Sequence, residues 1–547
     1  MDTTTSVDKP GGHTVGHHRD WPQTAPLKQI IEQIKEAIWR RRPILGDIMK
    51  GHGNDALCDY AQDFLDVNKA PVLDARKHEL IDTAEELIGK RLGAHVGKAV
   101  ARQLRKMPMV STADHHGPID HPFWVNANII TALPYADQTD PDVQFLVVFS
   151  FASVSINNAS AYPRGILFHG GENGSGPLVR LPIMPDREKM GVVYGMRSFK
   201  LEDLDRAKAD LVKRERAGEI TDGRAAKITE ILNDYFASAD VLNAPDLASQ
   251  ITKINYRLWP KLFHQAHHKL EATKIPDLIY LEIETLVTEL LLRYHLDNSA
   301  SLINKFLFDP KYQEQVQVLF NNIPGAFSHE KDWGTHLFWA VDEKLHRVRL
   351  FLRNGFLESN EDNIRIAFTP EGIREALQNK KIFPSMVTCY LLVSLYYGMK
   401  CLGGFCQVND LTMTKEAWQE LLKRMGEMVE SDAVAPVQTK ELGGDGMVLS
   451  YLKTPTGDLV AATGIDMMLE EPETTFTGYR ELAKRVTLSE IMNPMLPEMY
   501  TVLYSIQDRD PALTAVSPEA IMKAVDLHHK ICQKLTLAEQ VAEAPAM

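Results

Sequence analysis

Ionisable side chains crowd into one short stretch of the chain, which reads DHHGPIDH from residue 114 to residue 121. Asp114, His115 and His116 stand first, and His121 follows them. An imidazole can donate a hydrogen bond to a phosphate or an oxyanion, and it can carry a proton near neutral pH. We therefore expect His115 and His116 to be catalytic donors or proton shuttles, with Asp114 orienting one of the two rings.

Two other interpretations of this stretch stay open. The first is a metal site whose ligands come from a set of acidic and histidine side chains: Asp114, His116, His121 and His169, or the pair His264 and His268. Such a site would make the protein a metal-dependent hydrolase or oxygenase. Adjacent side chains of a turn diverge, so we expect no metal here. The second interpretation is structural, with the aspartate capping a helix and the histidines solvated.

Side chains that could hold a substrate occur around this stretch and in two further ones, NNASAYPRGILFHGG and GMKCLGGFCQ. Arginine binds carboxylate or phosphate groups through two parallel hydrogen bonds, and paired glycines let a ligand approach the backbone closely. The predicted substrate-binding residues are His121, Asn126, Asn157, Asn158, Arg164, His169, Gly403, Gly404 and Gln407. Cys401 and Cys406 are interpreted as packing thiols, because neither a helix start nor a cation beside them indicates a lowered pKa.

The segments around these residues predict a strand–helix–strand unit. MPMVST (107–112) is a short strand, a helix starts within GPIDHPFWVNANII, and DVQFLVVFSFASVS (142–155) is an apolar run typical of a strand buried on both faces. Consecutive parallel strands end at the same edge of a sheet, where helix N-termini point N–H groups at anions. We therefore predict one pocket at that edge, lined by His115, His116, Asn157 and Arg164.

The chain of 547 residues is too long for one compact core. The order of helical and strand patterns along it predicts an α/β protein with several regions. The predicted regions are a disordered tail (1–25), an N-terminal helical region (26–106), a Rossmann-like parallel-sheet core (107–200 and 322–412), a helical insertion arm (201–321) and a mostly helical C-terminal region (413–547). Hairpins are predicted within 335–352 and 447–463.

The arm begins with charged helices at 201–237, which have few apolar positions to bury. We expect an antiparallel helix pair that projects from the core. A partner subunit would cover its apolar stripe in a homodimer: Leu204, Ala207, Leu211 and Ile228. A non-catalytic scaffold that assembles through this arm is therefore a further alternative function.

The composition narrows the range of partners. A net charge of −13 leaves no excess of basic residues to neutralise phosphates, so we expect no nucleic-acid binding. The most apolar stretch, MVTCYLLVSLYYGM, is too short to span a bilayer, and the N-terminus lacks an apolar signal core. The five cysteines form no CxxC pair, which favours a reducing cytoplasm. We expect a cytoplasmic protein with a small-molecule substrate and no membrane partner.

Three segments follow one another in an order that resembles a known family. They are VSTADHHGPIDHPFWVNANII, QFLVVFSFASVSINN and FPSMVTCYLLVSLYYGMKCLGGFCQVNDL, with a helical region between the second and the third. In this order the chain resembles the cysteine-adding bacillithiol synthases, over about a third of its length. The resemblance implies a Rossmann-like core with a coiled-coil insertion. Our leading hypothesis is a biosynthetic ligase or group transferase that acts on an anionic metabolite, with a nucleotide such as ATP as the candidate cofactor.

The chain departs from that family at the predicted pocket. Asp114, His115 and His116 stand where the family has a Gly-Gln-Gln type of turn, and Ser-Ile-Asn-Asn stands in place of an acidic loop. After the paired glycines the chain continues Phe-Cys-Gln, where the family has Gly-Pro-Gly-Glu. The resemblance therefore implies an architecture and the location of a site, and it leaves both the substrate and the reaction open.

Overall fold

A computed structural model describes most of the chain. The described residues are 24–171, 174–263, 275–331, 333–360, 363–454, 457–469 and 476–531. The predicted tail lies outside them except for its last two residues, which begin helix α1 (Thr24–Arg41). The pair His264 and His268 also lies outside the described residues.

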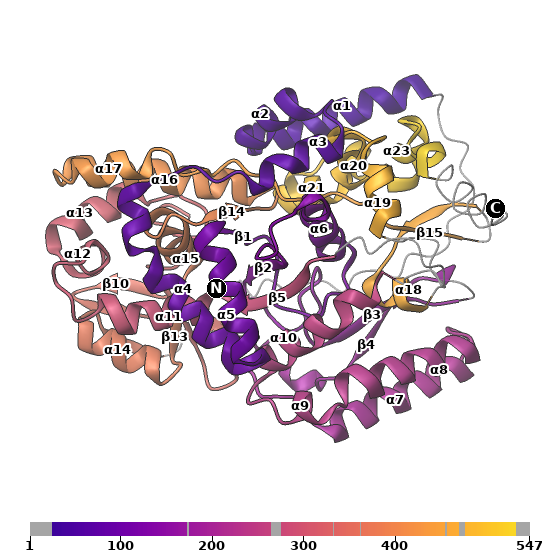
Figure 1. Ribbon diagram of the computed structural model, residues 1–547, viewed down its shortest axis with the longest axis horizontal. Coiled ribbons are helices and arrows are strands. Elements are labelled where there is room, and N and C mark those ends of the chain that lie inside the picture. The colour runs from indigo at the N-terminus through magenta and orange to yellow at the C-terminus, as the bar shows by residue number, and fades with distance from the viewer. Residues whose placement is uncertain are drawn as a thin grey trace.

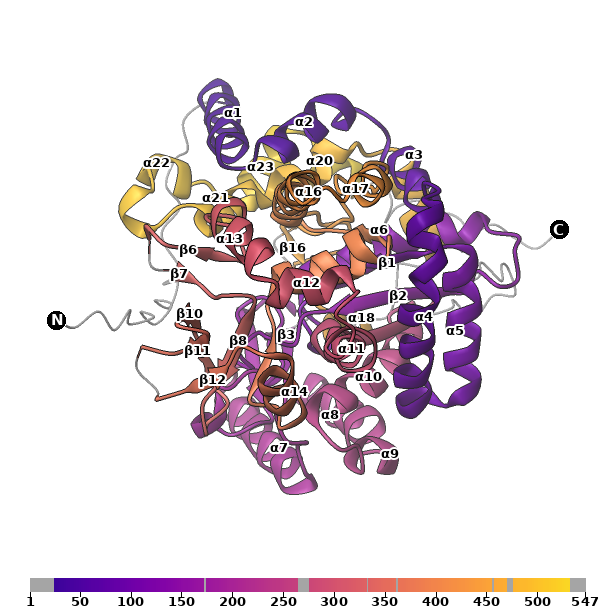
Figure 2. The same cartoon turned by 90° about the vertical axis from the view of Figure 1, so that its left-hand side faces the viewer.

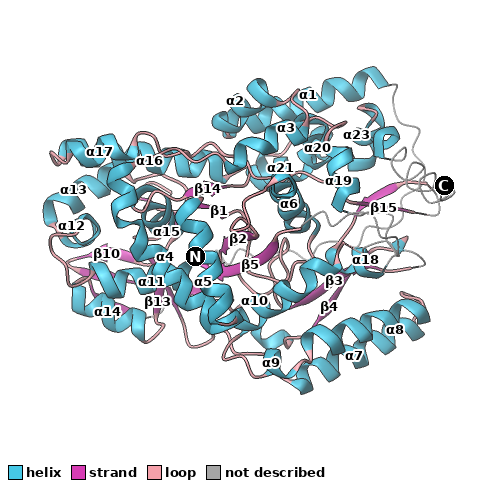
Figure 3. Ribbon diagram, in the orientation of Figure 1, coloured by secondary structure: helices cyan, strands magenta, loops and turns pink. Residues whose placement is uncertain are grey.

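A four-stranded parallel sheet lies in the middle of the protein, surrounded by helices (Figure 1; Figure 3). Its strands, in spatial order, are β5 (Asp277–Glu282), β2 (Phe145–Ser150), β1 (Met109–Ser111) and β14 (Lys400–Leu402). Helix α6 (Pro122–Ala132) connects β1 to β2. The predicted strand–helix–strand unit and the mixed α/β class are therefore confirmed.

Both faces of the sheet are buried. Leu146 and Tyr280 point into one apolar core, and their neighbours Val147 and Ile279 point into the other. The first core includes α6 and α10 (Leu247–Leu258), and the second includes α4 (Pro71–Leu92), α5 (Ala94–Lys106), α11 (Ile283–Leu290) and α15 (Met386–Tyr390). Figure 2 shows α4 and α5 side by side along one side of the sheet. Burial on both faces explains why the strands are apolar at almost every position.

The region 201–321 is not the purely helical insertion that the sequence predicts. Strand β5 lies within it and forms one edge of the central sheet. The sequence around it, PDLIYLEIETLVTELLLRYHL, suggests a single apolar helix, whereas the structure divides it into β5 followed by α11. A short run that is apolar at nearly every position fits a buried strand and a buried helix equally well, so its periodicity cannot distinguish them.

The prediction that the helix pair at 201–237 projects from the core is also wrong. Helices α7 (Leu201–Arg216) and α8 (Asp222–Ile231) pack on each other, on β4 (Leu178–Pro182) and on α18 (Gly464–Leu469) (Figure 1; Figure 2). The apolar stripe is at most 1% exposed at Leu204, Ala207, Leu211 and Ile228. The chain's own core covers this stripe, so the stripe gives no reason to expect a partner subunit.

We expect Leu211→Ala to lower the free energy of unfolding by about 2 kcal/mol, because it leaves a cavity in a packed core. The oligomeric state should not change, since the side chain packs within one chain. Urea denaturation and sedimentation velocity measure the two quantities. A variant with unchanged stability and an altered sedimentation coefficient would contradict this packing and restore the stripe as an interface.

Two further strand predictions are confirmed. Hairpins form from β8 (Phe338–Val341) and β9 (Arg347–Val348), and from β15 (Tyr451–Lys453) and β16 (Leu459–Ala461). Strand β3 (Gly165–His169) pairs antiparallel with β4 in a separate ribbon. The other strands are β6 (Phe327–Ser328), β7 (Trp333–Gly334), β10 (Phe351–Arg353), β11 (Phe356–Glu358), β12 (Arg365–Ala367) and β13 (Ile382–Pro384).

The terminal regions are helical, as predicted. Figure 1 shows the N-terminal helices α1, α2 (Pro43–His52) and α3 (Leu57–Gln62) beside the C-terminal helices α19 (Phe476–Ala483), α20 (Leu488–Met492), α21 (Leu496–Leu503) and α23 (Pro518–Ala524). Helix α22 (Pro511–Thr514) contacts α1, as Figure 2 shows. The remaining helices are α9 (Ala239–Leu242), α12 (Leu302–Phe308), α13 (Pro310–Leu319), α14 (Pro370–Gln378), α16 (Gln407–Arg424) and α17 (Met428–Val434). None of the helices in the described part of the chain combines the length and the hydropathy that a membrane-spanning helix needs.

Candidate functional site

The stretch DHHG follows β1 at the carboxyl edge of the central sheet. Beyond the last sheet residues, Phe151 donates its N–H to the carbonyl of Asp114 (2.9 Å), and His116 donates its N–H to the carbonyl of Phe151 (2.8 Å). These bonds tie the turn after β1 to the segment after β2. The edge at which the sequence predicts a site is therefore formed by these two strands.

Asp114 is fully buried and does not orient an imidazole, contrary to expectation. Its Oδ2 accepts hydrogen bonds from Asn128 Nδ2 (2.6 Å) and from the Tyr280 hydroxyl. Burial raises the pKa of Asp114 to about 6, and both hydrogen bonds oppose that rise. The carboxyl group holds α6 and β5 beneath the turn.

His116 is fully buried, and both of its ring nitrogens are occupied. Nδ1 lies 2.7 Å from the hydroxyl of Ser150, and Nε2 donates to the carbonyl of Ala248 at 2.9 Å. Since a carbonyl only accepts, the proton is on Nε2, and Nδ1 accepts from the serine. Burial lowers the pKa of His116, which keeps the ring neutral. We correct the expected catalytic role of His116 to a structural one.

His115 turns the other way and is only half-buried. Its Nδ1 lies 3.3 Å from Asn158 Oδ1 and 3.2 Å from the hydroxyl of Ser160, and its ring packs 5.2 Å from the ring of Trp124. A proton on Nδ1 that is donated to Asn158 leaves a lone pair on Nε2, for which no partner lies among the described residues. Burial, with a contribution from the charge of Arg347, lowers the pKa of His115 to about 4. The ring is therefore neutral at pH 7 and can accept a proton.

Two arginines reach the segment after β2 from other elements. Arg347, from β9, places its guanidinium 4.3 Å from the Trp339 ring, with Nη1 3.5 Å from the carbonyl of Ser153. Arg180, from β4, donates from Nη2 to the carbonyl of Ala159 at 3.4 Å. Across the described residues, no carboxylate lies within ion-pair distance of either guanidinium. Long contacts to neutral carbonyls are weak, so both positive charges stay available to a ligand.

A buried carboxyl group faces this region from below. Glu284, at the start of α11, accepts the N–H groups of Ala152 and Ser153, both at 2.9 Å. Burial raises its pKa to about 7, and its charge acts on Arg347. This carboxyl group fixes the end of β2, and it is only partly ionised near pH 7.

His121 caps α6, since its Nδ1 accepts the N–H of Phe123 at 3.3 Å. Burial, with contributions from the charges of Arg180 and His115, lowers its pKa to about 3. The buried indole N–H of Trp124 has no partner among the described residues. We define the His115 site as His115, His121, Trp124, Asn158, Ser160, Arg180 and Arg347.

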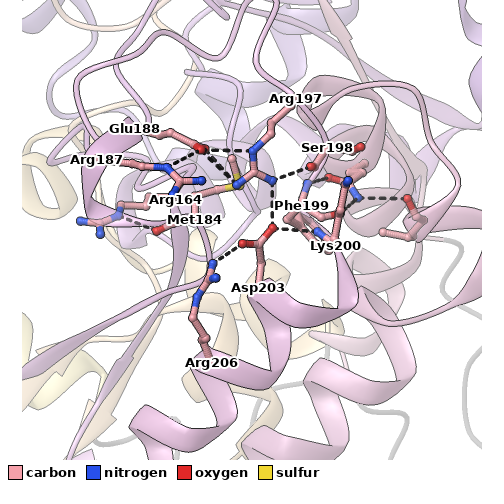
Figure 4. A network of polar contacts seen from close by, with 12 residues as sticks. Arg164, Met184, Arg187, Glu188, Arg197, Ser198, Phe199, Lys200, Asp203 and Arg206 are labelled. Atoms are coloured by element: carbon pink, nitrogen blue, oxygen red, sulfur yellow. Dashed lines mark hydrogen bonds and ion pairs between the residues drawn. The ribbon is translucent and has the colours of Figure 1, made fainter. Parts of the chain in front are cut away.

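The predicted pocket of His115, His116, Asn157 and Arg164 does not form as one unit. Asn157 lies in the same loop as Asn158, and its N–H donates to the carbonyl of Lys189 at 3.2 Å. Arg164 Nε donates to the carbonyl of Met184 at 2.9 Å, and its Nη1 pairs with Asp186 at 3.2 Å. Figure 4 shows this guanidinium beside the ion pairs that join Glu188, Arg197 and Asp203 at the start of α7.

Other predicted substrate-binding residues also brace the chain. Asn126 is fully buried, and its Oδ1 accepts the N–H groups of Leu449 and Ser450, both at 2.7 Å. Gln407 Nε2 donates to the hydroxyl of Thr112 at 2.6 Å. A Cβ atom on Gly403 would clash with the side chain of Gln407, and one on Gly404 would clash with Asp445. The paired glycines do allow a close approach, but the groups that approach belong to the chain itself.

Cys406 differs from the prediction in its surroundings. It is the N-cap residue of α16, and its Sγ lies 3.6 Å from Arg42 Nη2, so both a helix start and a cation are beside it. Burial nevertheless raises the pKa of the thiol to about 11. The thiol is therefore protonated at neutral pH, as a packing thiol would be.

The four residues of the predicted metal site have separate partners. His116 and His121 are engaged as described above, Asp114 holds Tyr280, and His169 pairs with Asp466. In the described ranges, no three His, Cys, Asp or Glu side chains form a group that could hold a metal ion. The structure does not assemble the ligand set on which the hydrolase or oxygenase alternative depends.

Comparisons with models of known protein families and with curated proteins find no match.

The His115 site contains four residues that the sequence did not predict: Trp124, Ser160, Arg180 and Arg347. Arg180 had a local signal, since it is the one charged residue in the apolar stretch PLVRLPIMP. Arg347 had none, because only the packing of a distant hairpin brings it to the site.

Proposed function

We propose that the chain is an enzyme with a Rossmann-like core that binds a small anionic substrate at the His115 site. Numbered by their order in the chain, the four strands β5-β2-β1-β14 follow the spatial order 3-2-1-4. This is the order of the first four strands of a Rossmann sheet. Helices α6 and α10 lie on one face and α11 and α15 on the other, so the connections change face where β14 returns beside β1. In such sheets, ligands bind outside the carboxyl ends of the strands.

Side chains of the protein already fill part of the carboxyl edge of the sheet, and this determines where along the edge a ligand can bind. Directly at β1 and β14, the side chains of Gln407 and Asp445 occupy the space beside the paired glycines. The neighbouring ends of β1 and β2 are half-exposed at His115 and Asn158. We therefore place the substrate over the ends of β1 and β2.

The observation that carries the proposal is the pair of arginines without a carboxylate partner in the described chain. Guanidinium groups bind carboxylate and phosphate with two parallel hydrogen bonds. Arg180 acts on His121, and Arg347 acts on His115, so the two charges flank neutral imidazoles. Burial is the main cause of the lowered pKa of both imidazoles, and an anion bound between the arginines would offset the smaller part that their charges contribute.

The same geometry supports a reaction class. A bound anion raises the pKa of a nearby imidazole by about 1 to 3 units, which would bring His115 from a weak base toward the working range of a general base. Such a base can remove the proton of a nucleophile while that nucleophile forms a bond to the group that is joined or transferred. We infer a ligase-like or group-transfer reaction in the cytoplasm, in line with the resemblance to the bacillithiol synthases. A nucleotide such as ATP would place its phosphates on the arginines.

We expect binding of sulfate, pyrophosphate or ATP to raise the Tm of the protein, because a ligand that binds only the folded state stabilises it. Arg180→Gln and Arg347→Gln should each weaken binding about fivefold, since each removes a charge-assisted contact to the anion. Isothermal titration calorimetry measures the affinities, and thermal denaturation without anion checks that the variants fold.

Arg187→Gln is the matched control, because the side chain of Arg187 is 80% exposed and its contact to Glu188 is long, at 3.5 Å. This variant should bind anions like the wild type. Equal affinities in the wild type and both site variants would overturn the assignment of the arginines. Absence of any anion binding would overturn the proposed function.

A further inference from the structure

A second histidine, His169, is paired with a buried carboxylate near the end of β3. Its Nδ1 lies 2.6 Å from Asp466 Oδ2, and Asp466 is fully buried. The carboxylate also accepts the N–H of His169 (2.9 Å), the guanidinium of Arg224 (2.9 Å) and the N–H of Thr463 (3.1 Å). Four donors hold this carboxylate in one orientation, and the carboxylate in turn orients the imidazole.

The pairing selects one tautomer of His169. An ionised carboxylate only accepts, so the ring proton is on Nδ1 and the lone pair is on Nε2. The His169 side chain is 13% exposed, and Nε2 has no partner in the described chain. A buried carboxylate on Nδ1 with a free Nε2 is the arrangement by which proteins position a histidine general base.

The register of the β3–β4 ribbon places His169 next to the His115 site. Leu167 pairs with Arg180, and His169 pairs with Leu178. His169 and Arg180 therefore project from the same face of the ribbon as diagonal neighbours, about 7 to 8 Å apart, a distance that a long side chain can bridge. The Arg180 guanidinium, in turn, contacts the loop that holds His115.

An unsatisfied polar atom lies in the same neighbourhood. Asp120 precedes His121 in the chain and is fully buried, and its charge interacts with that of Asp466. Its Oδ2 accepts the N–H of Leu167 at 2.9 Å, whereas its Oδ1 has no partner in the described structure. The carboxyl group of Asp120 therefore joins the segment before α6 to β3 beside His169.

We propose that His169, positioned by Asp466, is a second acid–base group of the His115 site. The inference rests on the proposed function and extends it to a substrate class. The substrate would be an elongated molecule whose anionic group lies on Arg180 and Arg347 and whose far end carries an amine, hydroxyl or thiol. His169 Nε2 accepts the proton of that group, and Asp466 balances the charge of the resulting imidazolium.

The alternative is that the pair of His169 and Asp466 only ties β3 to α8 and α18, through Arg224. The two roles differ in their response to an anion. If His169 faces the site, an anion bound on Arg180 lies close enough to change its environment, whereas an imidazole that is turned away from the site would not respond.

The test is NMR of protein labelled with ¹³C at histidine Cε1, titrated with pyrophosphate, with signals assigned from His115→Gln and His169→Gln. We expect the His115 and His169 signals to shift with one common dissociation constant. His295, which is 1% exposed and bonded to Tyr397 and Ser301, is the internal control that should not respond.

The outcomes separate the inference from the proposed function. A response of His115 alone would overturn the role of His169 and leave the proposed function standing. A response of neither histidine would overturn both. Asp466→Asn adds a second variant: if it folds, the His169 signal should already differ from the wild type without pyrophosphate, because no carboxylate holds the proton on Nδ1, while His115 still responds to pyrophosphate. An unchanged His169 signal in this variant would overturn the positioning role of Asp466.

Discussion

His116→Ala lowers the free energy of unfolding by about 4 kcal/mol, because it combines a buried cavity with the loss of two hydrogen bonds. The hydroxyl of Ser150 and the carbonyl of Ala248 would be left without their partner in a region closed to water. Those two groups lie on β2 and α10, so the imidazole joins a sheet strand to the helix that covers it.

Urea denaturation followed by circular dichroism measures this loss. His78→Ala is the matched control, since His78 is exposed on α4 and should change stability by less than about 0.5 kcal/mol. A chelator should leave the wild-type stability unchanged, because His116 is held by a hydroxyl and a carbonyl. A His116→Ala variant as stable as the control would contradict the buried network.

The two adjacent histidines show where prediction from sequence stops. Both could be recognised as chemically competent, and Asn158 could be placed beside them through the adjacency of β1 and β2. Which of the two points inward depends on the backbone path of one turn, and the bonds of that turn to Phe151 decide it. Sequence patterns carry no signal for this choice, because both residues have the same side chain.

The fold, like the site, could be predicted from the sequence only in part. Strands β1 and β2 and two hairpins follow from apolar runs and turn residues, whereas β5 does not, since LIYLEI continues without a break into an apolar helix. The two arginines that we propose to bind an anion were harder still to predict from the sequence. Arg180 and Arg347 stand far apart in the chain, and only the packing of the β3–β4 ribbon and the β8–β9 hairpin brings both to the loop after β2.

A pH dependence follows from the protonation state of His115. Its pKa of about 4 in the free site is below the usual value, so the ring is neutral from pH 8 down to about pH 5. A bound dianion raises that pKa, so the complex takes up a proton in the interval between the free and the bound values. By linkage, the affinity for the anion then increases as the pH falls through this interval, and it does not increase at higher pH.

We expect the affinity for sulfate to rise about tenfold between pH 6.5 and pH 5 in the wild type, because an anion shifts a nearby imidazole pKa by about 1 to 3 units. Sulfate is the probe because it does not titrate in this range. Calorimetry in buffers of different ionisation enthalpy should also detect the uptake of a proton on binding.

Two variants assign this effect. His115→Gln should remove the rise, because its amide cannot take up a proton. Glu284→Gln should keep it, since the Glu284 carboxyl, whose pKa is raised to about 7 by burial, is already largely protonated below pH 6.5. His121 has a lower pKa, about 3, and contributes mainly below this range. If His115→Gln retained the full rise, the proton would be taken up elsewhere, and His115 could not be the base of this site.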